Sequence, residues 1–448
     1  MGKLRLALAA GYPAVVSVSE QRWALPLAIF VLCAGIYSAT AADRLTRPSA
    51  NNHYVHLAQA WLDGRLDLGP VPPGTNDWAC YDTVGEGPCP EGRYRFSGPE
   101  ALRYRWYVSF PPLPAVLLVP VVAIFGLGTL DALLWVLLAG LVPALLFIVL
   151  RFLRESGRSP RTEGDDLLLA GLFAVGSVFF FVAVQGTVWF AAHVVASVFV
   201  CLYLLFAFGA RRPAVAGVVL GLAFLSRPAT ALLAVFFFVE AVRESKQDPR
   251  GLVRRLALFA VPFAVLALLA MGHNAVRFDD PLEFGHRFLQ VRWRSRIETW
   301  GLFSTHYLPR NLAVFFLSVP WWVGASPFVR ISRHGLALWF TTPNLFWGIF
   351  AKKPDVTIAG LWLAVLSTAL CTLLYQNTGW VQFGPRFALD YLPLLFVLVA
   401  LSGRGFGRAF WACAVFAVAL NTFGAVTFDR HRQFYDDDPT QRVIFQPD

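Results

Sequence analysis

The chain has 448 residues, of which 57% are hydrophobic and only 15% are charged, and its net charge at neutral pH is +10. An average soluble domain carries about 25% charged residues, so this chain cannot cover a water-facing surface of its size. It is also far too apolar to be disordered. The composition therefore predicts an integral membrane protein, and a nucleic acid is not expected as the partner of the positive charge.

The first apolar run, 24–42, is long enough to cross a bilayer. An uncleaved helix is favoured there over a cleaved signal, because many apolar runs follow. After a polar stretch comes the run 110–126, which has only 17 residues and contains four prolines. The further apolar runs are 130–150, 167–186, 187–209, 214–224, 229–242, 256–271, 335–351, 356–375, 388–401 and 409–428.

The short basic loops indicate which runs cross the membrane, because cytoplasmic loops carry an excess of Lys and Arg. If 110–126 is interfacial or re-entrant, every short basic loop falls on the side of the N-terminus. The sequence then predicts an all-α polytopic protein with about eleven transmembrane helices, a cytoplasmic N-terminus and an extracytoplasmic C-terminus. Residues 1–448 form a single membrane domain with outer loops at 43–109 and 273–334. The basic loops are 151–161, 211–212, 243–255, 352–353 and 404–408.

Two of the six cysteines, Cys80 and Cys89, lie in the polar first outer loop. A disulfide between them is favoured over two unpaired thiols if this loop lies outside the cytoplasm. No Cys/His spacing typical of a zinc site is present, so the sequence predicts no metal ligands.

The apolar runs hold almost no ionisable residues, whereas proton-coupled transporters usually place acids within their spans. This pattern favours a site at the outer membrane face. In the first outer loop, Tyr54 and Trp61 belong to an amphipathic surface helix. Arg103 and Arg105 follow beside aromatic residues, a pattern that fits a phosphate headgroup and equally fits an aromatic belt.

Charged residues also precede the short apolar run 388–401. The second outer loop holds Glu283 and Arg287, and the later loop holds Gln382, Arg386 and Asp390. An Arg and an Asp at the start of such a helix are costly unless they are paired or bind a ligand. The alternative to a ligand site is an i,i+4 pair between Arg386 and Asp390.

Several segments together resemble the GT-C superfamily of membrane glycosyltransferases. The resemblance includes the protein O-mannosyltransferases and aminoarabinose transferases, and points to an uncharacterised bacterial branch. It implies a GT-C fold in a bacterial inner membrane, acting in the cell envelope. The matching segments are 54–66, YVSFPPLPAVLLVP, GLAFLSRP, HNAVRFDDPLEFGHRF and QFGPRFALDYLP.

The resemblance implies transfer of a sugar from a polyprenyl-phosphate donor to a glycan, lipid or protein acceptor at the extracytoplasmic face. An acid after the first helix would act as general base or hold a metal, and arginines would hold the lipid phosphate. The family's usual acid positions are occupied here by Ala50 and Asn51. A divalent metal is left open, without support from an acidic motif.

The roles implied by the resemblance are therefore assigned to nearby residues. Asp43 is the candidate base, with His53, Asp82 and Glu283 as fallbacks. The candidate phosphate ligands are Arg103, Arg105, Arg287 and Arg386, with Tyr54, Gln382 and Asp390 in support.

Two other classes of function remain as alternatives to an enzyme. One is a flippase or transporter for a lipid or solute, and the other is a non-catalytic membrane scaffold. A transport path predicts charged groups within the spans, of which the sequence has few. A scaffold has no need for arginine-rich outer loops with interleaved aromatic residues.

Overall fold

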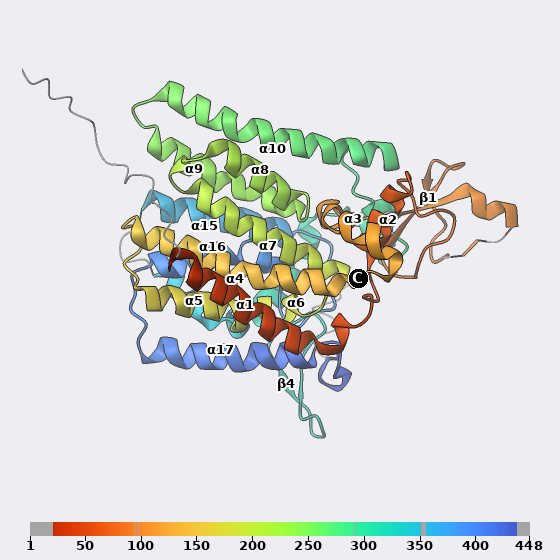
Figure 1. The fold of residues 1–448 in the computed structure, drawn as a ribbon. Coiled ribbons are helices and arrows are strands. Elements are labelled where there is room, and N and C mark those ends of the chain that lie inside the picture. Colours follow the sequence, from red (N-terminus) through yellow and green to blue (C-terminus); the bar gives the residue numbers. More distant parts are fainter. Residues whose placement is uncertain (1–20, 94, 97, 292, 351–354, 437–448) are drawn as a thin grey trace, which may run out of the picture.

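The computed structural model describes residues 21–93, 95–96, 98–291, 293–350 and 355–436, and its long helices run side by side in one bundle (Figure 1). The six longest are α1 (Gln21–Ala41), α4 (Asp131–Glu155), α7 (Val188–Ala207), α10 (Pro249–Phe278), α15 (Val356–Leu373) and α17 (Arg408–Thr427). The shorter helices are α2 (His53–Leu62), α3 (Leu113–Phe125), α5 (Glu163–Val175), α6 (Phe179–Ala183), α8 (Pro213–Phe224), α9 (Ala234–Glu244), α11 (Arg294–Trp300), α12 (Leu308–Leu317), α13 (Leu338–Thr341), α14 (Phe346–Ile349) and α16 (Leu392–Leu401).

Six helices of the described residues are long and apolar enough to cross a membrane, so the chain is a multi-pass membrane protein. The other five predicted spans are short or interrupted. For example, the run 167–186 forms α5 and α6, and the run 335–351 forms α13 and α14 around a turn at Pro343. The total of eleven spans therefore stays a prediction, as does the interfacial position of 110–126.

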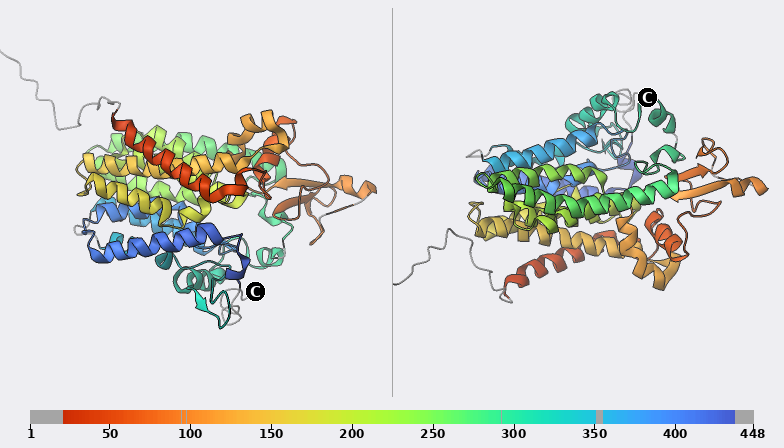
Figure 2. Two further views of the ribbon diagram at one scale, coloured as in Figure 1. Left: turned by 60° about the horizontal axis from the view of Figure 1, so that its bottom comes forward. Right: turned by 90° about the horizontal axis from the view of Figure 1, so that it is seen from above.

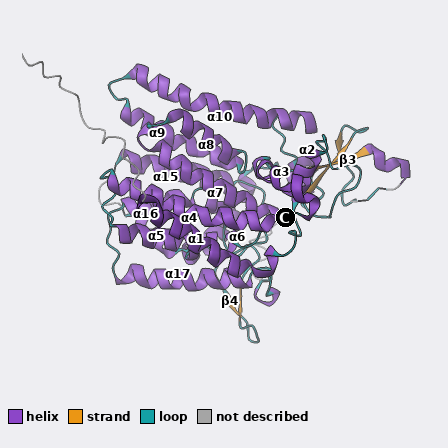
Figure 3. Cartoon of the chain, in the orientation of Figure 1, coloured by secondary structure: helices purple, strands orange, loops and turns teal. Residues whose placement is uncertain are grey.

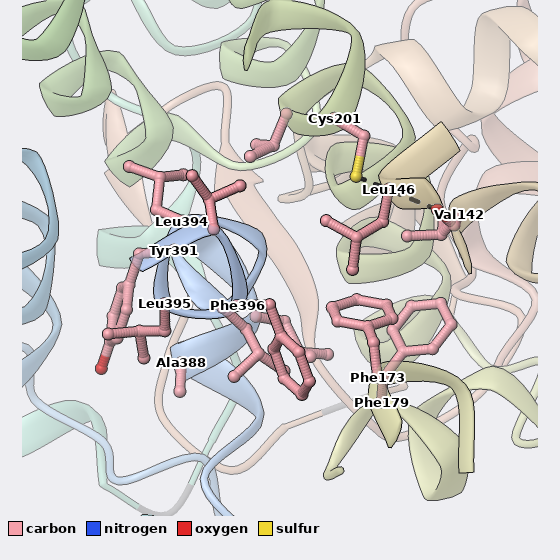
Figure 4. Close-up of a cluster of buried hydrophobic side chains, with 14 of the residues drawn as sticks. Val142, Leu146, Phe173, Phe179, Cys201, Ala388, Tyr391, Leu394, Leu395 and Phe396 are labelled. Carbon is pink, nitrogen blue, oxygen red and sulfur yellow. Dashed lines mark hydrogen bonds between the residues drawn. The ribbon is translucent and has the colours of Figure 1, made fainter. Parts of the chain in front are cut away.

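Helix α16 shows why a short helix can belong to the bundle. It is apolar all round, and its residues 392–400 are all buried, which is the pattern of a helix in the core rather than one that faces lipid. Figure 4 shows its side chains Leu394, Leu395 and Phe396 close to those of the helices around it, including Phe173 and Phe179.

Glycines allow α8 and α10 to pack closely against each other. A Cβ atom at Gly217 would lie 2.1 Å from the carbonyl oxygen of Phe259, and one at Gly221 would lie 2.6 Å from the side chain of Leu266. Small residues four apart let two helix backbones approach closely, which favours association within a bilayer. This contact explains why Gly217 and Gly221 are tolerated inside a helix.

The strands form two small patches outside the helix bundle (Figure 3). The first is an antiparallel sheet in the order β2-β1-β3 within the first outer loop, where Cys80 pairs with Trp106 in register. The disulfide between Cys80 and Cys89 is present and joins β1 to the segment after β2. The strands are β1 (Trp78–Asp82), β2 (Gly87–Pro88), β3 (Tyr104–Val108), β4 (Trp321–Trp322) and β5 (Val329–Arg330).

The predicted outer loops meet at one end of the bundle (Figure 2). The backbone N–H of Gln290 donates to the carbonyl of Trp78 at 3.1 Å, which joins the second loop to the first. Arg310 donates through Nη2 to the carbonyl of Gln376 at 2.7 Å, which joins the second loop to the segment 376–390. The connections α4–α5 and α9–α10 lie at the opposite end (Figure 1). Lys352, Lys353 and both termini lie outside the described residues.

The predicted orientation can be tested by accessibility of a new cysteine. Ser156 is exposed in the α4–α5 connection, and Leu102 is exposed beyond the opposite end of the bundle. We expect an impermeant thiol reagent to label Leu102→Cys in intact cells but to leave Ser156→Cys unlabelled until the membrane is opened. The parent chain provides the background of its own thiols, and the reverse labelling pattern would invert the topology.

Candidate functional site

A buried ion pair joins two turns at the end of the bundle where the predicted outer loops meet. Asp390 ends the 3-10 helix η9 (Arg386–Asp390), and its carboxylate accepts hydrogen bonds from Nε and Nη2 of Arg227 at 3.1 and 3.0 Å. The Nδ1 atom of His193 in α7 lies 3.2 Å from the same carboxylate. Asp390 and His193 are buried. The bidentate hydrogen bonds from Arg227 therefore compensate the charge of Asp390, which would be costly to bury alone.

The alternative prediction of an ion pair between Arg386 and Asp390 is wrong. The Nη1 atom of Arg386 donates to the carbonyls of Gly379 and Val381, the second at 3.1 Å. The carboxylate of Asp390 is hydrogen-bonded to Arg227 instead. Their positions in the short 3-10 helix turn the two side chains toward different partners.

Arg386 is a buried cation whose side-chain partners are carbonyl groups. Its guanidinium lies 5.4 Å from the ring centres of Phe190 and Phe387, and its Nε atom has no partner among the described residues. Burial lowers its pKa to about 9. Gln382 fixes the loop by accepting the Arg386 backbone N–H and donating to the carbonyls of His334 and Thr378. A desolvated guanidinium with an unpaired donor is suited to bind an anion.

Asp77 supplies an acid from the first outer loop to the same region. It immediately precedes β1, with a left-handed backbone at φ +56°, and its Oδ2 accepts a hydrogen bond from Trp189 Nε1 at 2.7 Å. His53 holds the neighbouring residues: its Nε2 lies 2.9 Å from the carbonyl oxygen of Asn76, and its ring stacks on Trp78 at 3.8 Å. The predicted residue His53 therefore supports the loop that carries Asp77.

The electrostatics of Asp77 link it to the arginines. Burial raises the pKa of its carboxyl group, although the hydrogen bond from Trp189 and the charge of Arg386 act in the opposite direction. Tyr375 interacts electrostatically with Arg227, Asp77 and Arg386. Three separate segments thus bring one carboxylate with a raised pKa and two guanidinium groups into the same region. The carboxylate can accept a proton, and the guanidinium groups can hold an anionic leaving group.

The other predicted acids have local partners. Asp43 is exposed just after α1 and forms ion pairs with Arg47 at 3.0 Å and Arg430 at 3.2 Å. Its pKa is lowered, chiefly by the hydrogen bond from Arg430. Glu283 is buried, and its Oε1 accepts the backbone N–H of Gly285 at 2.6 Å, which closes a turn. Burial raises the pKa of Glu283.

The other predicted arginines lie on the outer loops. Arg103 pairs with Asp82, and this hydrogen bond is the main reason that the pKa of Asp82 is lowered to about 2. Arg105 pairs across the sheet with Tyr81, and Arg287 is exposed. Within the described residues, no hydrogen bond or ion pair joins these arginines to Asp77 or Asp390.

Tyr54 is buried in α2, and its hydroxyl has no hydrogen-bond partner among the described residues. Its ring packs edge-on against Phe110 and Trp135. Tyr54 also interacts electrostatically with Arg227, so it borders the same charged region.

Sequence reasoning missed Asp77, Arg227 and His193. Asp77 stands beside Trp78 in a loop whose other acids look equivalent in sequence, and Arg227 lies inside the matched segment GLAFLSRP. The one available signal was that Arg227 is a lone charge between two apolar runs, where an unpaired cation is costly.

The described residues contain no group of three His, Cys, Asp or Glu side chains placed to hold a metal ion. This finding concerns sites built from protein side chains alone, since Mg²⁺ can also be held by one or two carboxylates together with substrate phosphates.

Comparison with known proteins identifies the fold. No protein-family model and no curated protein matches the chain. The archaeal oligosaccharyltransferase AglB from Archaeoglobus fulgidus, solved with an inhibitory peptide and a dolichol-phosphate, has a similar structure with a TM-score of 0.50 at 12% sequence identity. The fold is that of the GT-C membrane glycosyltransferases. The similarity covers 94% of this chain, which spans 57% of the length of AglB.

Two further solved structures share less of the GT-C fold. ArnT from Cupriavidus metallidurans, bound to undecaprenyl phosphate, has a TM-score of 0.46 at 14% identity, covering 90% of this chain and 64% of its own. The Archaeoglobus fulgidus oligosaccharyltransferase in its apo form has a TM-score of 0.43 at 13% identity, covering 91% and 57%.

The buried ion pair predicts a large effect of one substitution on stability. Asp390→Asn leaves Arg227 without its anion, and removing one partner of a buried pair costs about 3–5 kcal/mol. We expect the unfolding temperature of the purified protein in detergent to fall clearly. Asp43→Asn, which loses an exposed pair, is the matched control and should change it little. Equal unfolding temperatures for the two variants would contradict this account.

Proposed function

We propose that the protein is a glycosyltransferase that uses a polyprenyl-phosphate sugar and transfers the sugar at the extracytoplasmic face of a bacterial cytoplasmic membrane. The observation that carries the proposal is that Arg227 and Arg386 meet at the ring of Phe387, 5.1 and 5.4 Å from its centre, while Asp77 interacts with the charge of Arg386. The GT-C fold supports it, since AglB, which shares the fold, was solved with a dolichol-phosphate. The acceptor is a glycan, a lipid or a protein, and membrane lipids surround the site.

In the proposed reaction, Asp77 acts as the general base. Its carboxylate takes the proton of an acceptor hydroxyl, and the acceptor oxygen attacks the anomeric carbon of the donor. The bond from that carbon to the phosphate oxygen breaks, and polyprenyl phosphate leaves with the bonding electron pair. The raised pKa of Asp77 makes it a stronger base than an ordinary aspartate once it is ionised.

The arginines would stabilise the leaving phosphate. The Nε atom of Arg386 has no hydrogen-bond partner among the described residues, and Asp390 orients the guanidinium group of Arg227. Guanidinium groups bind phosphate oxygens through directed hydrogen bonds and lower the energy of the developing charge. His193 and Gln382 would keep the two arginines in place through the contacts described above.

The base assignment predicts different effects for two aspartates. With purified protein and a labelled polyprenyl-phosphate sugar, we expect Asp77→Asn to reduce transfer by at least about a hundredfold, the usual lower limit for a lost general base. Asp43→Asn should retain transfer. Parent activity should fall as the pH drops through the raised pKa of Asp77, because a protonated carboxyl cannot accept a proton.

The opposite result would move the base to Asp43. Loss of transfer in Asp43→Asn, with activity retained in Asp77→Asn, would do so. Glu283→Gln and Asp82→Asn complete the series of predicted acids. An inactive parent with every donor tested would instead favour a flippase or a scaffold.

The phosphate assignment predicts weaker donor binding in an arginine variant. A hydrogen bond to a charged group contributes about 1.5–3 kcal/mol, so Arg386→Ala should weaken binding of a polyprenyl phosphate by about 10- to 150-fold. Arg386→Lys should restore it only in part, because an ammonium group lacks the planar guanidinium fork. Arg287→Ala removes an exposed arginine as the matched control. Equal affinities for Arg386→Ala and the folded parent would exclude this role.

A further inference from the structure

We propose that the hairpin formed by β4 and β5 inserts among the lipid headgroups of the extracytoplasmic leaflet and anchors the neighbouring loop there. We call residues 321–330 the aromatic hairpin. The surface that the aromatic hairpin contacts is lipid. This membrane contact is independent of sugar transfer.

The aromatic hairpin presents large apolar side chains to the exterior. Trp322 is 81% exposed and Phe328 is 57% exposed. At the adjoining end of α12, Phe316 is 51% exposed and Leu317 is 69% exposed. The backbone N–H of Val323 donates to the carbonyl of Phe328 at 2.8 Å, so the turn is closed by its own hydrogen bond. Exposed apolar side chains grouped in this way mark a surface that contacts something other than water.

The base of the aromatic hairpin is fixed at the level where α17 ends. The backbone N–H of Ile331 donates to the carbonyl of Phe434 at 2.8 Å, and Arg330 forms an ion pair with Asp436 at 2.7 Å. Tyr435 is in turn hydrogen-bonded through its hydroxyl to Thr427, the last residue of α17, at 2.7 Å. Because α17 is long and apolar enough to span the membrane, its end marks the membrane boundary.

The direction of the aromatic hairpin keeps it at that boundary. It projects sideways from the bundle, transverse to the helices, in the views of Figures 1 and 2. A segment that leaves the bundle sideways at this level runs along the membrane surface. Tryptophan is enriched at such interfaces, where its ring is apolar and its N–H is polar.

Continuity with the lipid-facing surface selects lipid over a protein partner. On α17, Trp411 is 52% exposed and Val415 is 70% exposed, as expected for a spanning helix at the edge of the bundle. The aromatic hairpin leaves the bundle at the C-terminal end of this helix, where Val426 is 44% exposed, and it shares the exposed apolar character of the helix. Arg333, exposed just after the hairpin, provides a cation for lipid phosphates.

The anchor is connected to the candidate site. The carbonyl of Arg333 accepts the backbone N–H of Gln382 at 3.0 Å, and the carbonyl of His334 accepts Nε2 of Gln382 at 2.8 Å. The backbone N–H of Leu336 donates to the carbonyl of Phe383 at 2.8 Å. The segment that follows the aromatic hairpin, residues 331–336, is therefore hydrogen-bonded to the loop that carries Arg386. Lipid contact at the hairpin would set the depth of this guanidinium relative to the headgroups.

Depth-dependent fluorescence quenching in nanodiscs tests the anchor. The four free cysteines are replaced, and Trp322→Cys and Phe328→Cys are labelled separately with an environment-sensitive fluorophore. We expect blue-shifted emission and greater loss of intensity with lipids labelled near the headgroup than with lipids labelled at the chain end. Val415→Cys on α17 should show the reverse order, and Leu102→Cys on the outer loop should respond to neither lipid.

Two outcomes would overturn the proposal. Hairpin probes that behave like Leu102→Cys, and are quenched only by a water-soluble quencher, would place the hairpin in water. Probes that are protected from lipid-borne and aqueous quenchers alike would show that another protein surface covers the hairpin. Neither result depends on transfer activity, so the proposed function is tested separately.

Discussion

The end of the bundle where the predicted outer loops meet depends on charge compensation for one buried carboxylate. Asp390 stands at the start of α16, where water is excluded, and its bidentate partner Arg227 comes from the turn between α8 and α9. His193 adds a contact from α7, so three separate parts of the bundle meet at one carboxylate. An isolated charge in this position would be too costly to retain. Because Arg227 satisfies Asp390, Arg386 remains a cation with an open donor, which the proposed function assigns to the donor phosphate.

Long uninterrupted helices could be predicted from the sequence, since 20 or so consecutive apolar residues have few alternatives in a membrane protein. The run 409–428, for instance, differs from α17 by only one residue at each end. The interrupted helices could not be predicted, because the breaks depend on local features. Between α5 and α6, the hydroxyl of Ser177 donates to the carbonyl of Phe173 and accepts the backbone N–H of Phe179. Pro343 interrupts the segment between α13 and α14.

Prediction from the sequence was limited in the same way for site residues whose partners lie far away along the chain. The sequence could single out Arg386, Gln382 and Asp390, because polar residues at the start of an apolar helix are costly unless they are paired or bind a ligand. Their partners could not, since Arg227 lies 163 positions from Asp390 in the chain. Asp77 resembles its neighbouring acids until folding places it against Trp189, 112 positions away. With Ala50 and Asn51 at the positions where the resemblance led us to expect an acid, the proposed base comes from later in the same loop.

A structure determined with a bound polyprenyl phosphate tests the central claim most directly. Our account predicts that the phosphate oxygens lie within hydrogen-bond distance of the guanidinium groups of Arg386 and Arg227, with the Asp77 carboxylate facing the position of the anomeric carbon. A phosphate bound instead at the exposed arginines Arg103, Arg105 or Arg287, away from Asp77, would contradict the account.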